Sequence, residues 1–298
     1  MRESGGAAFH SADLGIIGGS GLYAFDGLQD VTEAELRTPY GDPSGPLVLG
    51  TAGNRRIAFL PRHGRGHRIA PSQVPARANI YALKSLGVRE VISVSAVGSL
   101  RGDFAPGDMV VLDQLFDRTS GLRPASFFGD GMVAHVSMAD PYCGRLRPLL
   151  ERVAAGEHAT VHGSGTYCCI EGPQFSTRAE SEVFRSWGMD VIGMTALPEA
   201  KLAREAELCY AGLALVTDYD CWHPGHASVD AQGVAEIMEA NVAAAQRVVM
   251  RFAETSRPAS CGCHRALDKA IMTDSQIIRG GPESTVPTLL RGRIAPVG

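Results

Sequence analysis

Along the chain, short runs of apolar residues alternate with longer segments in which apolar residues recur every three or four positions. Near-continuous apolar runs are typical of strands that are covered on both faces, and the longer period is that of an amphipathic helix. The predicted strands are Leu14–Ile17, Leu47–Leu49, Ile57–Leu60, Val91–Val97, Met109–Leu112, Gly165–Ile170, Val191–Met194 and Ala211–Thr217. The predicted helices are Ala76–Leu86, Arg145–Ala154, Ala179–Trp187, Ala200–Glu207 and Val229–Ala253. This alternation predicts an α/β fold, with a mixed, mostly parallel sheet flanked by helices.

No linker-like break or internal repeat divides this pattern, so we expect a single domain. It should span residues 1–257, with its core at 14–253, because the pattern weakens after about Arg257. Residues 258–298 are predicted to form a C-terminal tail with one short helix near Ala266–Met272. Thr177 and Glu180 have the spacing of a capping box, which predicts the start of the third helix.

Composition narrows the class of protein. The 298 residues are 45% hydrophobic and 20% charged, as in an ordinary globular protein. A net charge of −4 without any block of Lys and Arg argues against nucleic-acid binding. The segment Met1–His10 lacks the basic and apolar parts of a signal peptide, and no apolar stretch reaches the length of a membrane span. We therefore expect a cytoplasmic protein with no membrane partner.

Seven cysteines are scattered along the chain, and an odd number suggests mostly reduced thiols. Cys261 and Cys263 are separated by one residue, which misses the two-residue gap of common zinc and redox motifs. No second Cys or His pair lies at ligand spacing, so no metal is predicted. A plain solvent-side pair is the preferred interpretation, and a local disulfide stays open.

Asp218 and Asp220 stand at the end of the most apolar predicted strand. Alternate residues of an extended chain share a face, so both carboxylates should point the same way. Two like charges at the mouth of a covered strand are costly unless ligand N–H groups or a raised pKa relieve them. The pair predicts a site that binds a ligand with N–H donors, and the alternative is an ordinary strand-end turn.

The loop GIIGGSG at 15–21 follows the first strand, and ligands of open α/β sheets bind at such strand ends. Its glycines and the Ser20 hydroxyl can cradle an anion. Gly19, Gly21 and Ala24 also fit the dinucleotide fingerprint, so a nicotinamide-dependent dehydrogenase is an alternative. That alternative lacks the acidic residue expected after the next strand. A phosphate loop is preferred, with a structural turn second.

Other strand ends carry groups suited to a small anion. Arg62 offers a planar fork for two phosphate oxygens and His63 a further donor, although a strand-end Arg also forms surface ion pairs. Ser95 could present its hydroxyl within SAVGS at 95–99, or the segment could be a tight turn. Thr195 could add a phosphate contact, and Met194 could pack on a sugar or in the core. Together these strand ends predict an anion site beside an amine-bearing ring.

At these positions the chain resembles the 5′-methylthioadenosine phosphorylases, in the trimeric branch of the purine nucleoside phosphorylase family. The resemblance runs from about Leu14 to Ala253 and makes residues 1–257 a phosphorylase domain. It rests on the runs GIIGGSGLY, TPYGDPSGPL, PRHGRGH, SAVGSLR, DRTSGLRPASFF, IEGPQFSTRAE, MTALPEAKLAREAELCYA and TDYDCW. It implies phosphorolysis of S-methyl-5′-thioadenosine to adenine and 5-methylthio-ribose 1-phosphate, in methionine and purine salvage.

The resemblance also assigns roles to individual residues. Phosphate would be held by Ser20, Arg62, His63, Ser95, Ala96 and Thr195, and Asp218 and Asp220 would face the purine. Met194 would lie against the ribose, while Ser176 and Val229 match positions tied to substrate preference. His135 matches a residue that lines the 5′-substituent pocket of a neighbouring subunit, which implies a homotrimer. Prokaryotic relatives with a similar tail form hexamers, and their Cys-x-Cys pair can be disulfide-bonded.

The residues agree with this chemistry. Fixed donors would position phosphate as the nucleophile, so no metal or organic cofactor is expected. Asp218 could protonate the leaving base at N7 if its apolar surroundings and Asp220 raise its pKa. Two acceptors would favour the 6-amino group of adenine over a 6-oxo group. A 6-oxopurine or methylthioinosine phosphorylase and a non-catalytic nucleoside-binding protein stay open, as does the group on the 5′ carbon.

Overall fold

The structure is a computed structural model that describes residues 11–19, 22, 27–129, 131–158, 160–225, 231–256, 258–280 and 289. Its strands are β1 (Leu14–Gly18), β2 (Gln29–Ala34), β3 (Leu47–Ala52), β4 (Arg55–Pro61), β5 (Glu90–Ser99), β6 (Met109–Val111), β7 (Gln114–Arg118), β8 (Val161–His162), β9 (Thr166–Ile170), β10 (Val191–Gly193) and β11 (Cys209–Asp218). Its helices are α1 (Ala76–Ser85), α2 (Leu146–Glu157), α3 (Arg178–Ser186), α4 (Glu199–Glu205), α5 (Ala231–Thr255) and α6 (Ser275–Gly280), with 3-10 turns η1 (Pro71–Gln73) and η2 (Gly262–Arg265).

All these strands join one mixed sheet in which β5 is the branching strand. The main path runs β2-β3-β4-β1-β5-β10-β9-β7, and β11, β6 and β8 extend from β5 on its other side. Strand β5 pairs in parallel with β1 and β11 and antiparallel with β10. The prediction of a mixed, mostly parallel sheet is confirmed.

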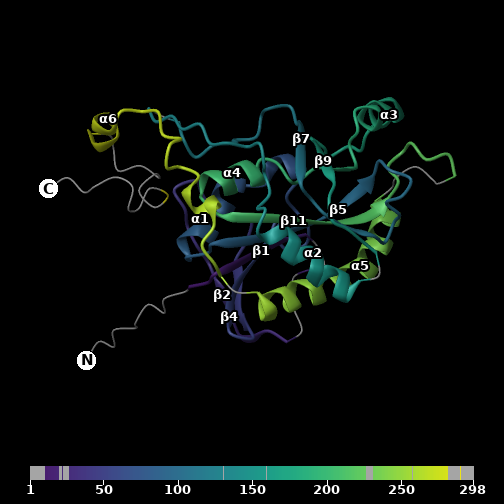
Figure 1. Ribbon diagram of the computed structural model, residues 1–298, viewed down its shortest axis with the longest axis horizontal. Helices are drawn as coiled ribbons and strands as arrows, with labels where there is room; N and C mark the ends of the chain where they lie inside the picture. The colour runs from purple at the N-terminus through teal and green to yellow at the C-terminus, as the bar shows by residue number, and fades with distance from the viewer. Residues whose placement is uncertain are drawn as a thin grey trace.

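Helices cover both faces of the sheet, as Figure 1 shows for α1 and α4 on one side and α2 and α5 on the other. Side-chain alternation along β11 explains its unbroken apolar sequence. Tyr210, Ala214 and Val216 pack in the core with residues of α1 and α4, whereas Leu213 and Leu215 pack with those of α2 and α5. Each position of the strand from Cys209 to Thr217 is therefore buried, whichever way it points.

Every predicted strand is present, and so are the five main helices, with ends that differ by a few residues. Thr177 and Glu180 form both hydrogen bonds of the predicted capping box at the start of α3. The strands that the apolar pattern missed are β2, β7 and β8. Strand β2 is almost wholly exposed at the sheet edge and β8 has two residues, so neither needs a run of apolar residues.

The prediction of a helix near Ala266–Met272 is wrong. That segment forms turns after η2, and the helix of the tail, α6, begins at Ser275. A hydrogen bond from the Met272 amide to the Val133 carbonyl, 2.9 Å long, and a β-bridge between Ala134 and Ile271 hold the segment against another loop. These tertiary bonds replace the i to i+4 bonds of a helix.

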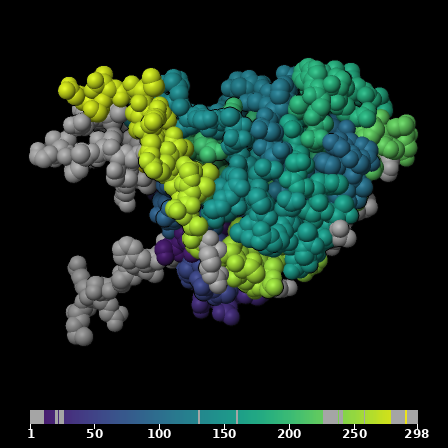
Figure 2. All heavy atoms as spheres, in the orientation of Figure 1, coloured from purple at the N-terminus to yellow at the C-terminus, as the bar shows by residue number. Residues whose placement is uncertain are grey.

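The tail crosses the outside of the molecule, and Figure 2 shows it as the yellow band that leads away from α5. Leu267 and Ala270 are buried there against Met132. In the described part of the chain, no helix is both long and apolar enough to cross a membrane.

Candidate active site

A cavity of about 520 Å³ opens where β5 changes partners. The cavity is lined by nine of the side chains that the sequence singled out, namely Arg62, His63, Ser95, Ala96, Ser176, Met194, Thr195, Asp218 and Asp220. They come from the ends of β4, β5, β10 and β11 and from the loop before α3. The prediction that these strand ends converge is confirmed, and their roles in binding are taken up below.

The pairing of β5 creates this cavity. Strand β11 lies along one edge of β5, while β1 and β10 share the other edge. Strand β1 pairs with Glu90–Ser93 and β10 with Gly98 and Ser99, so within the described chain no strand pairs with residues 94–97 on that edge. Ser95 and Ala96 are half-buried there, after five buried residues. A small ligand can therefore reach backbone N–H and C=O groups that would otherwise pair with a neighbouring strand.

Asp218 and Asp220 both line the cavity, but not through strand alternation. A bulge shifts the register between Val216 and Asp218, the strand ends at Asp218, and Asp220 has a φ of +49° in the following turn. Asp218 Oδ1 accepts the Asp220 N–H at 2.7 Å, and Oδ2 accepts the Thr217 hydroxyl at 2.7 Å. The Asp218 carboxyl is therefore held by the backbone of Asp220 and by the side chain of Thr217. Both carboxyls therefore face the same cavity, although strand alternation is not the reason.

Burial raises the pKa of both carboxyls above the ordinary value, and the negative charge of Asp220 adds to the rise for Asp218. A carboxyl with a raised pKa holds a proton more readily and can donate it. Gly98 makes this arrangement possible, because a Cβ at that position would lie 2.8 Å from Asp218 Oδ1. The glycine is required for close packing against the carboxyl rather than for a turn.

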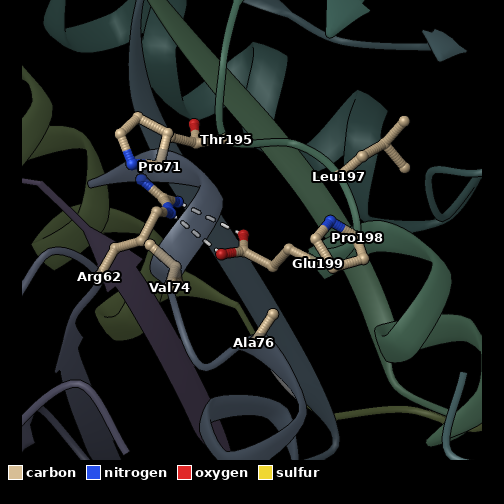
Figure 3. A pocket seen from close by; sticks show the side chains of 8 residues that line it. All are labelled: Arg62, Pro71, Val74, Ala76, Thr195, Leu197, Pro198 and Glu199. Atoms are coloured by element: carbon tan, nitrogen blue, oxygen red, sulfur yellow. Dashed lines mark hydrogen bonds and ion pairs between the residues drawn. The ribbon is translucent and has the colours of Figure 1, made fainter. Parts of the chain in front are cut away.

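The sequence led us to expect that the Arg62 guanidinium would bind two phosphate oxygens. In the structure most of its N–H groups donate to other groups of the protein instead. The side chain is almost fully buried, and Figure 3 shows its guanidinium facing the Glu199 carboxylate. Nε donates to Glu199 Oε2 at 3.0 Å, Nη1 to the Val94 carbonyl at 3.0 Å and Nη2 to Ser93 Oγ at 2.7 Å. Of the five N–H groups, one on Nη1 has no partner among the described residues. A bidentate grip on phosphate is therefore unavailable, and a single hydrogen bond remains.

Glu199 is the acceptor that fixes this arginine. Its Oε1 also accepts the Ser93 hydroxyl at 2.6 Å and the Tyr210 hydroxyl at 2.8 Å. Burial alone would lower the pKa of Arg62, but the Glu199 charge and hydrogen bond raise it above the ordinary value. The site therefore contains a buried ion pair rather than a free cation.

One of the two ring nitrogens of His63 also has a hydrogen-bond partner in the protein. Its Nδ1 lies 2.9 Å from the Ile69 carbonyl, which can only accept, so Nδ1 carries a proton and Nε2 is left for a ligand. Burial, with the Arg62 charge, lowers the pKa of His63 to about 4. The imidazole is neutral at pH 7, and Nε2 is then an acceptor. It would donate to an anion only after gaining a proton.

Thr195 and Met194 follow β10 at the cavity wall. The Thr195 amide donates to the Tyr167 hydroxyl at 3.2 Å. A Cβ at Gly193 would clash with that hydroxyl, and one at Gly172 would clash with Met194 Sδ. Both glycines thus allow close contacts that place the Met194 side chain and the Thr195 backbone.

Three predicted site residues are not placed in this cavity. Ser20 and Val229 lie outside the described residues. His135 is exposed and does not line the cavity, and its backbone amide donates to the Ala270 carbonyl at 2.8 Å. Ser176 does line the cavity, and its hydroxyl oxygen is buried without a hydrogen-bond partner in the described structure. Such a buried hydroxyl is suited to a ligand.

Sequence reasoning missed Glu199, which lies behind the cavity wall and bonds Arg62, and the apolar wall of the cavity formed by Ile170, Phe175 and Ile192. Glu199 stands five residues after Met194 in the same strand-end segment, so the sequence does place it near the site. Its pairing with Arg62 was not, because 137 positions separate the two residues.

A comparison with family models matches residues 13–254 to the phosphorylase superfamily. Among curated proteins, the S-methyl-5′-thioadenosine phosphorylase of Chloroflexus aurantiacus is 54% identical over 97% of this chain and 98% of its own length. The enzyme of the same name from Gloeobacter violaceus is 50% identical over 93% of this chain and 94% of its own.

Solved structures agree with these relatives. A methylthioadenosine phosphorylase from an Antarctic soil metagenomic library superimposes with a TM-score of 0.88, at 47% identity, over 94% of this chain and 99% of that chain. The methylthioadenosine phosphorylase of Schistosoma mansoni, solved in complex with adenine, has a TM-score of 0.75 at 38% identity, over 82% and 91% of the two chains.

Proposed function

The chain belongs to the phosphorylase superfamily and, within it, to the S-methyl-5′-thioadenosine phosphorylases, and we infer that it catalyses the reaction for which that family is named. The enzyme is a pentosyltransferase that acts on a nucleoside and phosphate. Phosphate attacks C1′ of S-methyl-5′-thioadenosine, the glycosidic bond breaks, and adenine and 5-methylthio-ribose 1-phosphate form. The observation that carries this function is one cavity that combines anion donors with two protonatable carboxyls.

Phosphate would occupy the part of the cavity between β1 and β10. The free edge of β5 at Ser95 and Ala96, the Thr195 side chain and the single spare N–H of Arg62 supply donors to it. Because the Arg62 charge is offset by Glu199, much of the phosphate charge would be met by neutral N–H and O–H dipoles. Fixed dipoles of this kind hold an anion for attack without reorganisation.

His63 would act on the phosphate proton. A neutral Nε2 accepts a hydrogen bond from the O–H of a monoprotonated phosphate and raises the negative charge on the attacking oxygens. This arrangement suits a nucleophile that must be anionic at C1′.

The purine would lie against Asp218 and Asp220. As the glycosidic bond breaks, negative charge builds on the base, and a protonated Asp218 can donate to N7. The remaining carboxyl oxygens accept from the 6-amino group, whereas a 6-oxo group would face acceptors. Adenine is therefore the preferred leaving base, with Met194 against the ribose and Ser176 beside the nucleoside.

We place the oligomeric state and the location of the enzyme in the same proposal. A homotrimer would bring the exposed His135 of one subunit to the 5′ group bound in the next, and a hexamer would be two such trimers. The enzyme would work in the cytoplasm without a metal or organic cofactor in the reaction, since phosphate is itself the nucleophile.

Purine release from a nucleoside panel tests the function. The panel contains S-methyl-5′-thioadenosine, 5′-deoxyadenosine, adenosine, S-methyl-5′-thioinosine and inosine, each with and without phosphate. We expect release of adenine that requires phosphate and is fastest with the methylthio substrate. Faster release from the two inosines would indicate a 6-oxopurine enzyme, and binding without release would indicate a nucleoside-binding protein.

A further inference from the structure

Four cysteines that lie apart in the sequence meet at one point of the structure. Cys143 precedes α2, Cys209 opens β11, and Cys261 and Cys263 lie in the tail at η2. All four sulfur atoms lie within 4.8 Å of one another, and Cys143 Sγ is 3.6 Å from Cys261 Sγ. Three of the four residues are buried, and all four are free thiols.

These separations fit a metal ion better than a pair of disulfides. Zinc bonds to thiolate sulfur at about 2.3 Å, and four sulfurs at tetrahedral angles then lie about 3.8 Å apart. A disulfide requires about 2.05 Å, so the sulfur atoms of Cys143 and Cys261, which are 3.6 Å apart, would have to approach by more than 1 Å. The cluster therefore has the size of a closed four-sulfur coordination site.

Positive and N–H groups surround the sulfur atoms. The guanidinium of Arg204 donates to Cys263 Sγ at 3.5 Å, and that of Arg145 donates to Cys209 Sγ at 3.8 Å. Arg89 Nη2 lies 2.8 Å from His264 Nδ1, which leaves the proton on Nε2, 3.4 Å from Cys209 Sγ. Nearby cations favour thiolate over thiol, and N–H donors to sulfur are typical of the shell around a metal.

We propose that Cys143, Cys209, Cys261 and Cys263 bind one Zn²⁺ ion per chain in a tetrahedral structural site. Thiolates are soft ligands that select zinc among the common divalent ions, and a four-thiolate site has no open position for substrate. Binding releases the thiol protons to solvent and changes no oxidation state. The complex carries a net charge of −2, which the guanidinium groups of Arg145 and Arg204 offset in part, because Arg145 also pairs with Glu90.

The place of the cluster in the fold indicates a structural role. Cys209 begins β11 and Asp218 ends it, nine residues later, so about 30 Å of strand separates the cluster from the carboxyls of the cavity. The metal would fasten the tail to the sheet. The same tail continues to Leu267, whose amide donates to Glu207 Oε1 at 3.0 Å, and to Ala270, which bonds the backbone of His135.

Metal content of the full-length protein tests the proposal. The protein is expressed with added zinc, purified under reducing conditions without chelator and measured by mass spectrometry of the elements. We expect about one zinc per chain. Replacement of the metal by Co²⁺ should give the intense visible absorption of a tetrahedral cobalt thiolate. Less than 0.1 metal ion per chain in the folded protein, before and after zinc addition, would overturn the proposal.

Variants locate the site. Cys261→Ser with Cys263→Ser should lower zinc content at least tenfold and lower Tm, whereas Cys168→Ala, which removes a buried cysteine outside the cluster, should keep one zinc. If the double variant fails to fold, alkylation of the wild-type protein decides. Four thiols of the zinc-loaded protein should be protected from alkylation by the metal. After a chelator has removed the zinc and the chain has been unfolded, all seven cysteines should react. Disulfides among the four cysteines in metal-free protein, without zinc uptake after reduction, would refute the site.

Discussion

Replacement of Asp218 by Asn tests the assignment of the base-binding carboxyl, because the change alters hydrogen bonding and charge with little change of shape. The amide oxygen can keep the bond from the Asp220 N–H that Oδ1 accepts at 2.7 Å. The amide nitrogen would meet the Thr217 hydroxyl, which is 3.2 Å from the Val97 carbonyl and can donate there instead. One amide N–H is left for the ligand. The fold can therefore accommodate the variant, with every polar atom of the amide paired in the protein except this N–H.

The size of the effect follows from the two 6-substituents. For a 6-aminopurine, the variant loses a hydrogen bond from the 6-amino group to a neutral carboxyl oxygen, about 0.5–1.5 kcal/mol. For a 6-oxopurine, it removes an unpaired acceptor, about 1–3 kcal/mol, and offers a donor. The sum is about 1.5–4.5 kcal/mol, so the preference should shift by about 10- to 10³-fold toward the oxo substrate. The absolute rate with S-methyl-5′-thioadenosine should also fall, because an amide cannot transfer a proton to N7.

The assay compares kcat/KM for S-methyl-5′-thioadenosine and S-methyl-5′-thioinosine, which differ only at position 6. Asp103→Asn serves as the control, since it removes an exposed carboxylate that pairs with Arg101 outside the cavity. The ratio of the two kcat/KM values should move in Asp218→Asn alone. A ratio that stays within about threefold of wild type, in a folded variant with normal KM for phosphate, would refute the role of Asp218.

Three further outcomes follow from the geometry of the cavity. Glu199→Gln should lower the free energy of unfolding by about 3–5 kcal/mol in urea, because it leaves the Arg62 guanidinium buried without its counter-charge. Gly98→Ala should lower kcat/KM by about 10²-fold, because the new Cβ displaces the Asp218 carboxyl, and the stability should change less. The raised pKa of Asp218 makes the stability of the protein depend on pH. The folded state binds the Asp218 proton more tightly than the unfolded state does, so stability is lost as the pH rises from about 4 through the raised pKa. The Tm of Asp218→Asn minus that of wild type should therefore be larger at pH 7.5 than at pH 4.

Each of these outcomes has a matched control. Glu182→Gln removes an exposed partner of Arg185 and should cost less than about 1 kcal/mol. Gly102→Ala adds a Cβ that meets nothing within 4 Å and should leave kcat/KM unchanged. A Tm difference that does not vary with pH would mean that the Asp218 carboxyl titrates as in the unfolded chain. A Glu199→Gln variant as stable as Glu182→Gln would mean that the ion pair with Arg62 contributes no stability.

Local pattern determined most of the fold. The apolar runs predicted each central strand, because a strand that is covered on both faces must be apolar at consecutive positions, as β11 is from Cys209 to Val216. Pattern failed where burial is not required, at the exposed β2, and where a tertiary contact replaces a local one, at Ala266–Met272. The motifs at the strand ends identified the family and nine residues of the cavity.

What each of those residues does was decided by tertiary structure. The sequence shows Arg62 as a free fork, but the folded chain brings Glu199 to it across 137 positions and leaves a single N–H for a ligand. It shows Cys261 and Cys263 as a pair with the wrong spacing for a metal, but Cys143 and Cys209 complete a four-sulfur cluster. Hydrophobic periodicity is a local property and can be seen in a short window. Hydrogen bonds and metal coordination depend on distances of a few ångströms between distant segments, and only the packed fold sets those distances.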